Sequence, residues 1–192
     1  MRAITFDIET KAASMVGGRL DVATLELTVV GVHDSSTGEY TGYFVEDLPK
    51  LWPVIEGADM LIGFNSDSFD IPVLNRYYPG DLTKIRSLDL LTEVYNALGR
   101  RVRLQSLAEA TLGRGKSGHG LDAVLWWEQG LHDKVRDYCI EDVRITRELY
   151  DYAREHGHLK YKDINQKKEV KIDASKWEEP SEGPSLTHTL GI

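Results

Sequence analysis

The first strand-like stretch, residues 2–9, constrains the fold most because its two faces differ in character. Large apolar side chains occupy every second position along it, which predicts a β-strand with one apolar face. Asp7 and Glu9 fall together on the other face, roughly 6.6 Å apart at about 3.3 Å of rise per residue. Two such carboxylates repel each other unless a divalent cation serves both. A solvated face is the ordinary alternative, because a lone Asp-x-Glu pattern is common.

The composition is that of a globular protein. With 192 residues, of which 41% are hydrophobic and 28% charged, the chain is expected to form one domain with a tail. No apolar run is long enough to span a bilayer, so we expect no membrane partner. Cys139 is the only cysteine, and charges between Arg2 and Lys11 interrupt any signal-peptide core, which favours a cytoplasmic location. The net charge of -8 argues against a generally basic nucleic-acid-binding surface, but it leaves a local basic path open.

The remaining sequence alternates between strand and helix patterns. Residues 25–33 and 40–45 continue the strand alternation across turn residues, so the opening three strands are expected to form an antiparallel meander. Further elements are expected as a helix at 47–56, a strand at 60–64, a helix from about Asp70 to Tyr78, a strand or extended segment at 85–89, and helices at 90–98, 104–112, 121–129 and 131–156. This order predicts an α/β fold.

A glycine-rich segment between residues 100 and 120 is the most basic part of this acidic chain. It contains five basic residues and one acidic residue, so it could contact phosphates, with a solvated charge run as the alternative. Its Gly-Lys-Ser sequence is not a P-loop, because Ala110 occupies the first glycine position and a helix precedes it. We expect the loop at 113–120 to be mobile.

The segment 131–156 shows the clearest helical pattern, with one apolar stripe at three- and four-residue steps. Asp142 lies inside that stripe. A buried carboxylate without a partner costs several kcal/mol or titrates to its neutral form, so a cation or strong donors should face it. Tyr138 lies one turn earlier on the same face. Before this helix, one of Trp126 and Trp127 is expected in the core, and base stacking is an alternative for the other.

Beyond Leu159 the sequence becomes polar and loses its periodicity, with lysines followed by glutamates and prolines. We therefore expect a domain at 1–158 and a polar C-terminal tail at 159–192, flexible or loosely docked. A nucleic-acid-binding or partner-binding arm is the alternative.

Three short motifs contain all of these candidate carboxylates. They are Phe6-Asp7-Ile8-Glu9-Thr10, then Gly63-Phe64-Asn65 with Phe69-Asp70, then Tyr138-Cys139-Ile140-Glu141-Asp142. In this order they resemble the motifs of the DEDD superfamily of 3′-5′ exonucleases, and they are most similar to those of the exonuclease domain of family B DNA polymerases. The resemblance implies an α/β, ribonuclease H-like fold, in which a mixed sheet with three antiparallel opening strands is flanked by helices.

The same resemblance implies the site residues. It assigns Asp7, Glu9, Asp70 and Asp142 as ligands of two divalent metal ions, Mg²⁺ or Mn²⁺, for which hard oxygen ligands are suitable. Tyr138, four residues before the last aspartate, resembles the marker of the tyrosine subclass, DEDDy. An ordinary tyrosine is neutral near pH 7, so we expect Tyr138 to orient the attacking water. A tyrosine that serves only the core is the alternative.

Substrate contacts follow from the resemblance as well. Asn65 and Phe69 are expected to line the substrate groove, and Thr10 to contact the 3′ end, while Phe69 as a plain core residue is the alternative. Asp67 and Glu141 are further carboxylates close by in the sequence, but the motif spacing favours Asp70 and Asp142 as ligands.

Together these features predict a metal-dependent 3′-5′ exonuclease that hydrolyses phosphodiester bonds at the 3′ end of single-stranded nucleic acid, DNA favoured and RNA open. The alternatives are a catalytically silent module that binds nucleic acid or a partner, and an endonuclease on the same fold. Since the chain carries no polymerase domain, we expect it to act alone or with a protein partner in replication, repair or nucleic-acid turnover.

Overall fold

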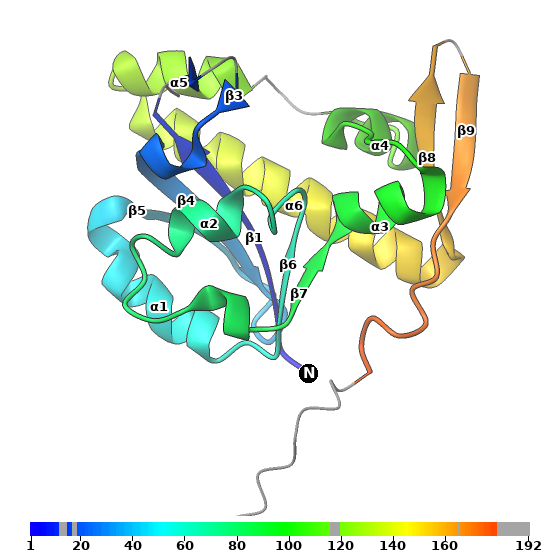
Figure 1. Ribbon diagram of the computed structural model, residues 1–192, viewed down its shortest axis with the longest axis horizontal. Helices are drawn as coiled ribbons and strands as arrows, with labels where there is room; N and C mark the ends of the chain where they lie inside the picture. Colours follow the sequence, from blue (N-terminus) through cyan, green and yellow to red (C-terminus); the bar gives the residue numbers. More distant parts are fainter. Residues whose placement is uncertain (12–14, 17–18, 116–119, 165, 180–192) are drawn as a thin grey trace, which may run out of the picture.

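The computed structural model describes residues 1–179 apart from 12–14, 17–18, 116–119 and 165. A mixed sheet of five strands runs through its centre in the order β5-β4-β1-β6-β7 (Figure 1). These strands are β1 (Ala3–Thr10), β4 (Leu27–Asp34), β5 (Tyr40–Phe44), β6 (Met60–Gly63) and β7 (Ser87–Asp89), and a small separate pair is formed by β2 (Met15–Val16) and β3 (Arg19–Leu20). The first three strands of the main sheet are antiparallel, as predicted, and β6 and β7 are parallel to β1.

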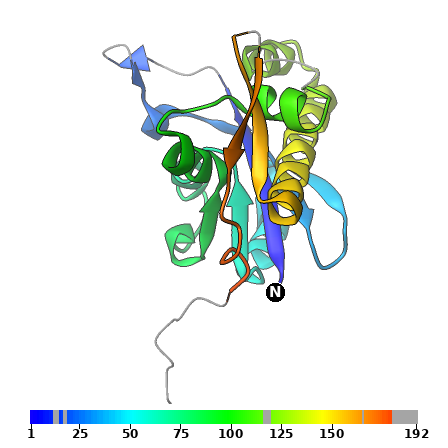
Figure 2. The same cartoon turned by 90° about the vertical axis from the view of Figure 1, so that its right-hand side faces the viewer.

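Helices cover both faces of this sheet. They are α1 (Leu48–Glu56), α2 (Asp70–Leu74), α3 (Leu90–Leu98), α4 (Leu104–Thr111), α5 (Gly120–Glu128) and α6 (His132–His156). The longest helix, α6, crosses one face against β1, β4 and β5, and Figure 2 shows it to one side of the sheet. The apolar side chains of β1 pack on the opposite face, against α1 and α2. The predicted division of β1 into two different faces is therefore confirmed.

Two aligned glycines allow α6 to lie close to the sheet. Gly31 of β4 pairs with Gly42 of β5, and both side-chain positions face the helix. A Cβ atom at Gly31 would lie 3.0 Å from Val143 and 3.1 Å from Cys139. Because Gly31 is also the partner of Asp7 on β1, this close approach of α6 falls beside the first acidic residue.

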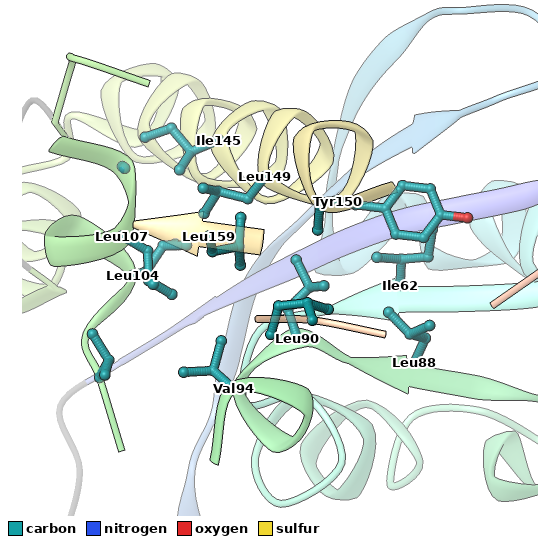
Figure 3. Close-up of a cluster of buried hydrophobic side chains, with 14 of the residues drawn as sticks. Ile62, Leu88, Leu90, Val94, Leu104, Leu107, Ile145, Leu149, Tyr150 and Leu159 are labelled. Carbon is teal, nitrogen blue, oxygen red and sulfur yellow. The ribbon is translucent and has the colours of Figure 1, made fainter. Parts of the chain in front are cut away.

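The largest core cluster lies between α6 and the parallel side of the sheet (Figure 3). Its labelled members come from β6, β7, α3, α4, α6 and the strand that follows α6: Ile62, Leu88, Leu90, Val94, Leu104, Leu107, Ile145, Leu149, Tyr150 and Leu159. Burial of these side chains joins α3, α4 and α6 in one core. Among the residues described, no helix combines the length and the apolar character that crossing a membrane requires.

The segment after α6 differs from the expected polar tail. β8 (His158–Asp163) and β9 (Gln166–Lys171) form an antiparallel hairpin beside α4 (Figure 1). Its alternate side chains and those just beyond it join the core: Leu159, Tyr161, Val170, Ile172 and Trp177. A period of two was present in this segment, but exposed lysines on the other face dominated its composition. Residues 180–192 of the expected tail lie outside the described residues, as do residues 116–119 of the loop expected to be mobile.

Two smaller expectations can be compared with the structure. The helix that begins at Asp70 ends at Leu74 rather than near Tyr78, and a turn follows it at 75–77. The segment left open at 85–89 contains the short parallel strand β7. Its last residue, Asp89, is the N-cap of α3.

Candidate functional site

Three carboxylates meet between β1 and α6. Asp7 and Glu9 lie on the face of β1 that α6 covers, and Asp142 lies on the inner face of α6. Each of these residues offers a carboxylate oxygen, and the three oxygens all lie within 4.8 Å of one another. Glu9 is only 9% exposed and Asp142 only 3%. Such crowding away from water carries an electrostatic cost that a divalent cation would relieve.

Asp70 lies beside this group. As the first residue of α2 it is 4% exposed, and its Oδ1 accepts a hydrogen bond of 3.1 Å from the backbone N–H of Ile8. Burial raises the pKa of Asp70 to about 7, with the negative charges of Asp89 and Asp142 adding to the rise and the Ile8 hydrogen bond opposing it. The fourth predicted ligand therefore contacts the same stretch of β1 that carries the first two.

The Cys139 thiol lies beneath the acidic group. It donates to the carbonyl oxygen of Asp7 at 3.3 Å, and its sulfur is 3.8 Å from Asp7 Oδ2. Burial, reinforced by the charges of Asp7, Glu9 and Asp142, raises the pKa of the Cys139 thiol well above its ordinary value. The thiol therefore stays protonated and acts as a donor toward β1. This role was not predicted from the sequence, although Cys139 lies within the third motif.

Tyr138 is buried one helical turn before Asp142. Its ring packs edge-on against Trp126 of α5, with 5.7 Å between ring centroids, and the Lys134 ammonium lies 3.9 Å from the centroid of the Trp126 ring. Trp126 and Trp127 are both partly buried against the apolar cluster that contains Tyr138. Helix α5 thus covers the tyrosine and limits the positions that its ring can adopt.

The three residues expected to contact substrate lie at different places around the carboxylates. Thr10 ends β1 just after a register shift against β4. Asn65 follows β6 and adopts a left-handed backbone conformation with φ of 66°. Phe69 directly precedes Asp70 and packs against the core beneath α1 and α2. The position of Phe69 fits the core role as well as the groove role, and substrate contact by all three residues stays a prediction.

A further buried carboxylate, Asp89, organises the loop between β6 and α2. Its Oδ1 accepts from the N–H groups of Asn65 at 2.7 Å and Leu91 at 2.9 Å, and its Oδ2 accepts from the Asp67 N–H at 3.3 Å. Asp89 therefore caps α3 and holds the loop that leads to Asp70. The sequence carried one signal for it, an aspartate directly before a helix, but no signal for its contact with the loop.

The two spare carboxylates of the motifs have other partners. Asp67 Oδ1 accepts a hydrogen bond of 2.6 Å from the Ser87 hydroxyl, and Glu141 forms a 3.8 Å ion pair with Arg114. Neither residue belongs to the group of three carboxylates that meet between β1 and α6.

Comparison with known proteins finds one matching family model and many similar solved structures. A family model described as the RNase_H superfamily matches residues 4–154. Among solved structures, 133 chains match, one of them the family B DNA polymerase from the hyperthermophilic archaeon Pyrobaculum calidifontis, with a TM-score of 0.60 and 18% sequence identity. That match covers 80% of this chain and 24% of the polymerase chain, so this chain spans about a quarter of the polymerase's length. At this identity the likeness concerns the fold alone. No curated protein matches the sequence.

Proposed function

The chain belongs to the RNase_H superfamily, and from this premise we propose that it is a metal-dependent 3′-5′ exonuclease of single-stranded nucleic acid, with DNA the favoured substrate and RNA the alternative. The observation that carries the proposal is the approach of the Asp7, Glu9 and Asp142 carboxylate oxygens to within 4.8 Å of one another. Asp70 adds a fourth carboxyl group, which accepts a hydrogen bond from β1, the strand that carries Asp7 and Glu9. Membership of the superfamily supports a nuclease, and the direction and substrate rest on the three sequence motifs.

The donor set fits hard divalent cations. We propose that Asp7, Glu9, Asp70 and Asp142 hold two ions, Mg²⁺ or Mn²⁺, because carboxylate oxygens are the ligands that such ions prefer. The raised pKa of Asp70 reflects burial close to other negative charges, which bound cations would offset. When bound, the ions lower the pKa of water and neutralise charge on the leaving oxygen.

The other residues of the site would position the reactants. The Tyr138 hydroxyl would orient a water for attack on the last phosphodiester, and packing of the ring on Trp126 would hold it in place. The new P–O bond forms to water as the bond to O3′ of the preceding nucleotide breaks, releasing a nucleoside 5′-monophosphate. Asn65, Phe69 and Thr10 would contact the terminal nucleotide.

The first test uses matched DNA and RNA oligonucleotides that carry a 5′ label. With Mg²⁺ or Mn²⁺ we expect a ladder of products shortened from the 3′ end. Asp7→Ala should abolish this ladder while the protein stays folded, because it removes one of the three clustered carboxylates. Asp67→Asn is the control, since this exposed residue accepts a hydrogen bond from Ser87 and lies outside the cluster of three carboxylates.

Other results would point to other functions. Binding of oligonucleotides without shortening of either substrate, with both metals, would support a catalytically silent module. Cleavage of circular single-stranded DNA, which has no 3′ end, would indicate an endonuclease.

A further inference from the structure

A small cavity adjoins the loop that leads into Asp70. Its volume is about 130 Å³, and residues of this loop, of the start of α3 and of the segment before α4 line it: Asn65, Ser68, Asp89, Leu91, Thr92, Tyr95 and Arg101. Leu91 is buried, whereas the Tyr95 ring is 50% exposed. The cavity therefore combines an apolar wall, an accessible aromatic ring and a cationic side chain.

The cavity lies at the same edge of the sheet as the acidic group. β1, β6 and β7 are parallel, so their carboxyl ends meet at one edge, which is where ligands bind in sheets of this kind. Glu9 is close to that end of β1, Asn65 follows β6, and Asp89 ends β7. A single-stranded nucleic acid whose 3′ end reached Glu9 could thus continue into the cavity.

Hydrogen bonds hold the wall of the cavity in a strained shape. Asn65 has a φ of 66°, in the left-handed region that few residues other than glycine, asparagine and aspartate adopt. Its N–H donates to Asp89 at 2.7 Å, and its Oδ1 accepts from the Ser68 hydroxyl at 2.8 Å and from the Arg101 guanidinium. Residues held in sparsely populated backbone conformations cluster at active sites, ligand clamps and switch regions.

Arg101 differs from Arg100 and Arg114 in its partner. Arg100 pairs with Asp163 at 3.2 Å, and Arg114 pairs with Glu148 at 2.6 Å. Arg101 donates to the neutral amide of Asn65, and within the described part of the chain no ion pair to a carboxylate offsets its charge. Its guanidinium can therefore bind an anion without first breaking an ion pair.

We infer that this cavity binds a nucleotide of the single-stranded substrate upstream of the bond that is cleaved. Arg101 contacts a phosphate of that nucleotide, and the Tyr95 ring stacks on its base. Both residues lie outside the three motifs. The inference rests on the proposed function and extends it, because it makes cleavage depend on the strand that precedes the terminal nucleotide.

The experiment compares two substrates in each variant: a ten-nucleotide strand, and the p-nitrophenyl ester of thymidine 5′-monophosphate, which has no upstream nucleotide. For Arg101→Ala and for Tyr95→Ala, we expect the ratio of the kcat/KM for the strand to that for the ester to fall about ten-fold, because one variant loses a phosphate contact and the other a stacked base. Tyr95→Phe keeps the ring and should restore the ratio. Arg103→Ala is the charge-matched control, because Arg103 is exposed and does not line the cavity.

Two results would overturn the inference. An equal fall of the ratio in Arg103→Ala would show a general effect of charge, and equal losses on both substrates would show a disturbed loop. If the unaltered protein cleaves neither substrate, the proposed function fails instead. The cavity is then tested by the fluorescence anisotropy of the labelled strand, where unchanged affinity in Arg101→Ala would reject it.

Discussion

At the scale of single residues, Asn65 has a backbone role and a side-chain role that can be separated. Its left-handed φ of 66° suits glycine but not alanine. We expect Asn65→Ala to lower the free energy of unfolding by about 1 kcal/mol, and Asn65→Gly to leave it nearly unchanged. Both variants lose the acceptor for Arg101 and Ser68, so both should cleave oligonucleotides more slowly. Urea denaturation and the labelled-strand assay measure the two effects, and equal stability of the two variants would contradict the backbone role.

The pair of Arg2 and Asp34 predicts a dependence of stability on pH. Arg2 Nη2 lies 2.6 Å from Asp34 Oδ2, and its hydrogen bonds, with those of Ser36, hold the pKa of Asp34 well below its ordinary range despite burial. The unfolded chain therefore takes up a proton at Asp34 before the folded protein does. The stabilisation is complete above about pH 4 and is lost as the pH falls from there toward the lower pKa of the folded state.

Asp34→Asn removes this titrating group. The free energy of unfolding should then change less between pH 5 and pH 2 than in the unaltered protein, as measured by urea denaturation at several pH values. Asp133→Asn is a control, because the Asp133 side chain is 80% exposed. Parallel pH curves for Asp34→Asn and the unaltered protein would contradict the prediction.

The residues of the candidate site that were predictable from the sequence are those marked by a local pattern. Alternation along β1 placed Asp7 and Glu9 on one face, and the apolar stripe of α6 placed Asp142 inside. The residues that were not predicted, Asp89 and Cys139, act through partners far away in the sequence. Asp89 accepts a hydrogen bond from a residue 24 positions away, and Cys139 donates one to a residue 132 positions away. No local pattern encodes such contacts.

At the scale of secondary-structure elements, the distance between α6 and the sheet depends on Gly31. The new Cβ of Gly31→Ala would lie 3.0 Å from Val143 and 3.3 Å from the Cys139 backbone. We expect a loss of about 1–3 kcal/mol in the free energy of unfolding, as is typical of overpacking. The displaced helix should also hold Asp142 farther from β1, so activity should fall further than stability explains.

A double-mutant cycle tests this explanation. Val143→Ala removes the nearest side-chain atom, so the combined variant should lose less stability than the sum of the two single variants. Additive losses would show that the clash at Gly31 is not with the Val143 side chain.

The elements themselves were mostly predictable because apolar periodicity marks them. The antiparallel opening strands and the long helix α6 follow from periods of 2 and 3.6 residues, and the strand at β6 follows from a short continuous apolar run. The β8–β9 hairpin was not recognised because its lysines outweigh its buried side chains in any count of composition. Leu159 and Tyr161 are buried while the residues between and after them bear charges, so the alternation was a better guide than the polarity.

At the scale of the whole molecule, metal binding should stabilise the fold. A ligand that binds only the folded state adds about 2.7 kcal/mol at 100 times its Kd, and each kcal/mol corresponds to roughly 2–4 °C in Tm for a chain of this size. We therefore expect saturating Mn²⁺ or Mg²⁺ to raise Tm by roughly 5–10 °C in a calorimetric scan. Asp142→Asn should reduce this shift strongly. Equal shifts in both proteins would place the ion elsewhere.

The central position of β1 also affects when the acidic group can form during synthesis. The backbone N–H of Ile8 donates a hydrogen bond to Asp70, 62 positions later, and the carbonyl oxygen of Asp7 accepts one from Cys139, 132 positions later. A nascent chain that ends before α6 holds three of the four carboxyl groups but lacks Asp142. The group that we propose as the nuclease site is therefore completed only after most of the domain has been translated and α6 has docked. Under the same proposal, an unfinished chain would lack a complete metal site and would not cleave nucleic acid.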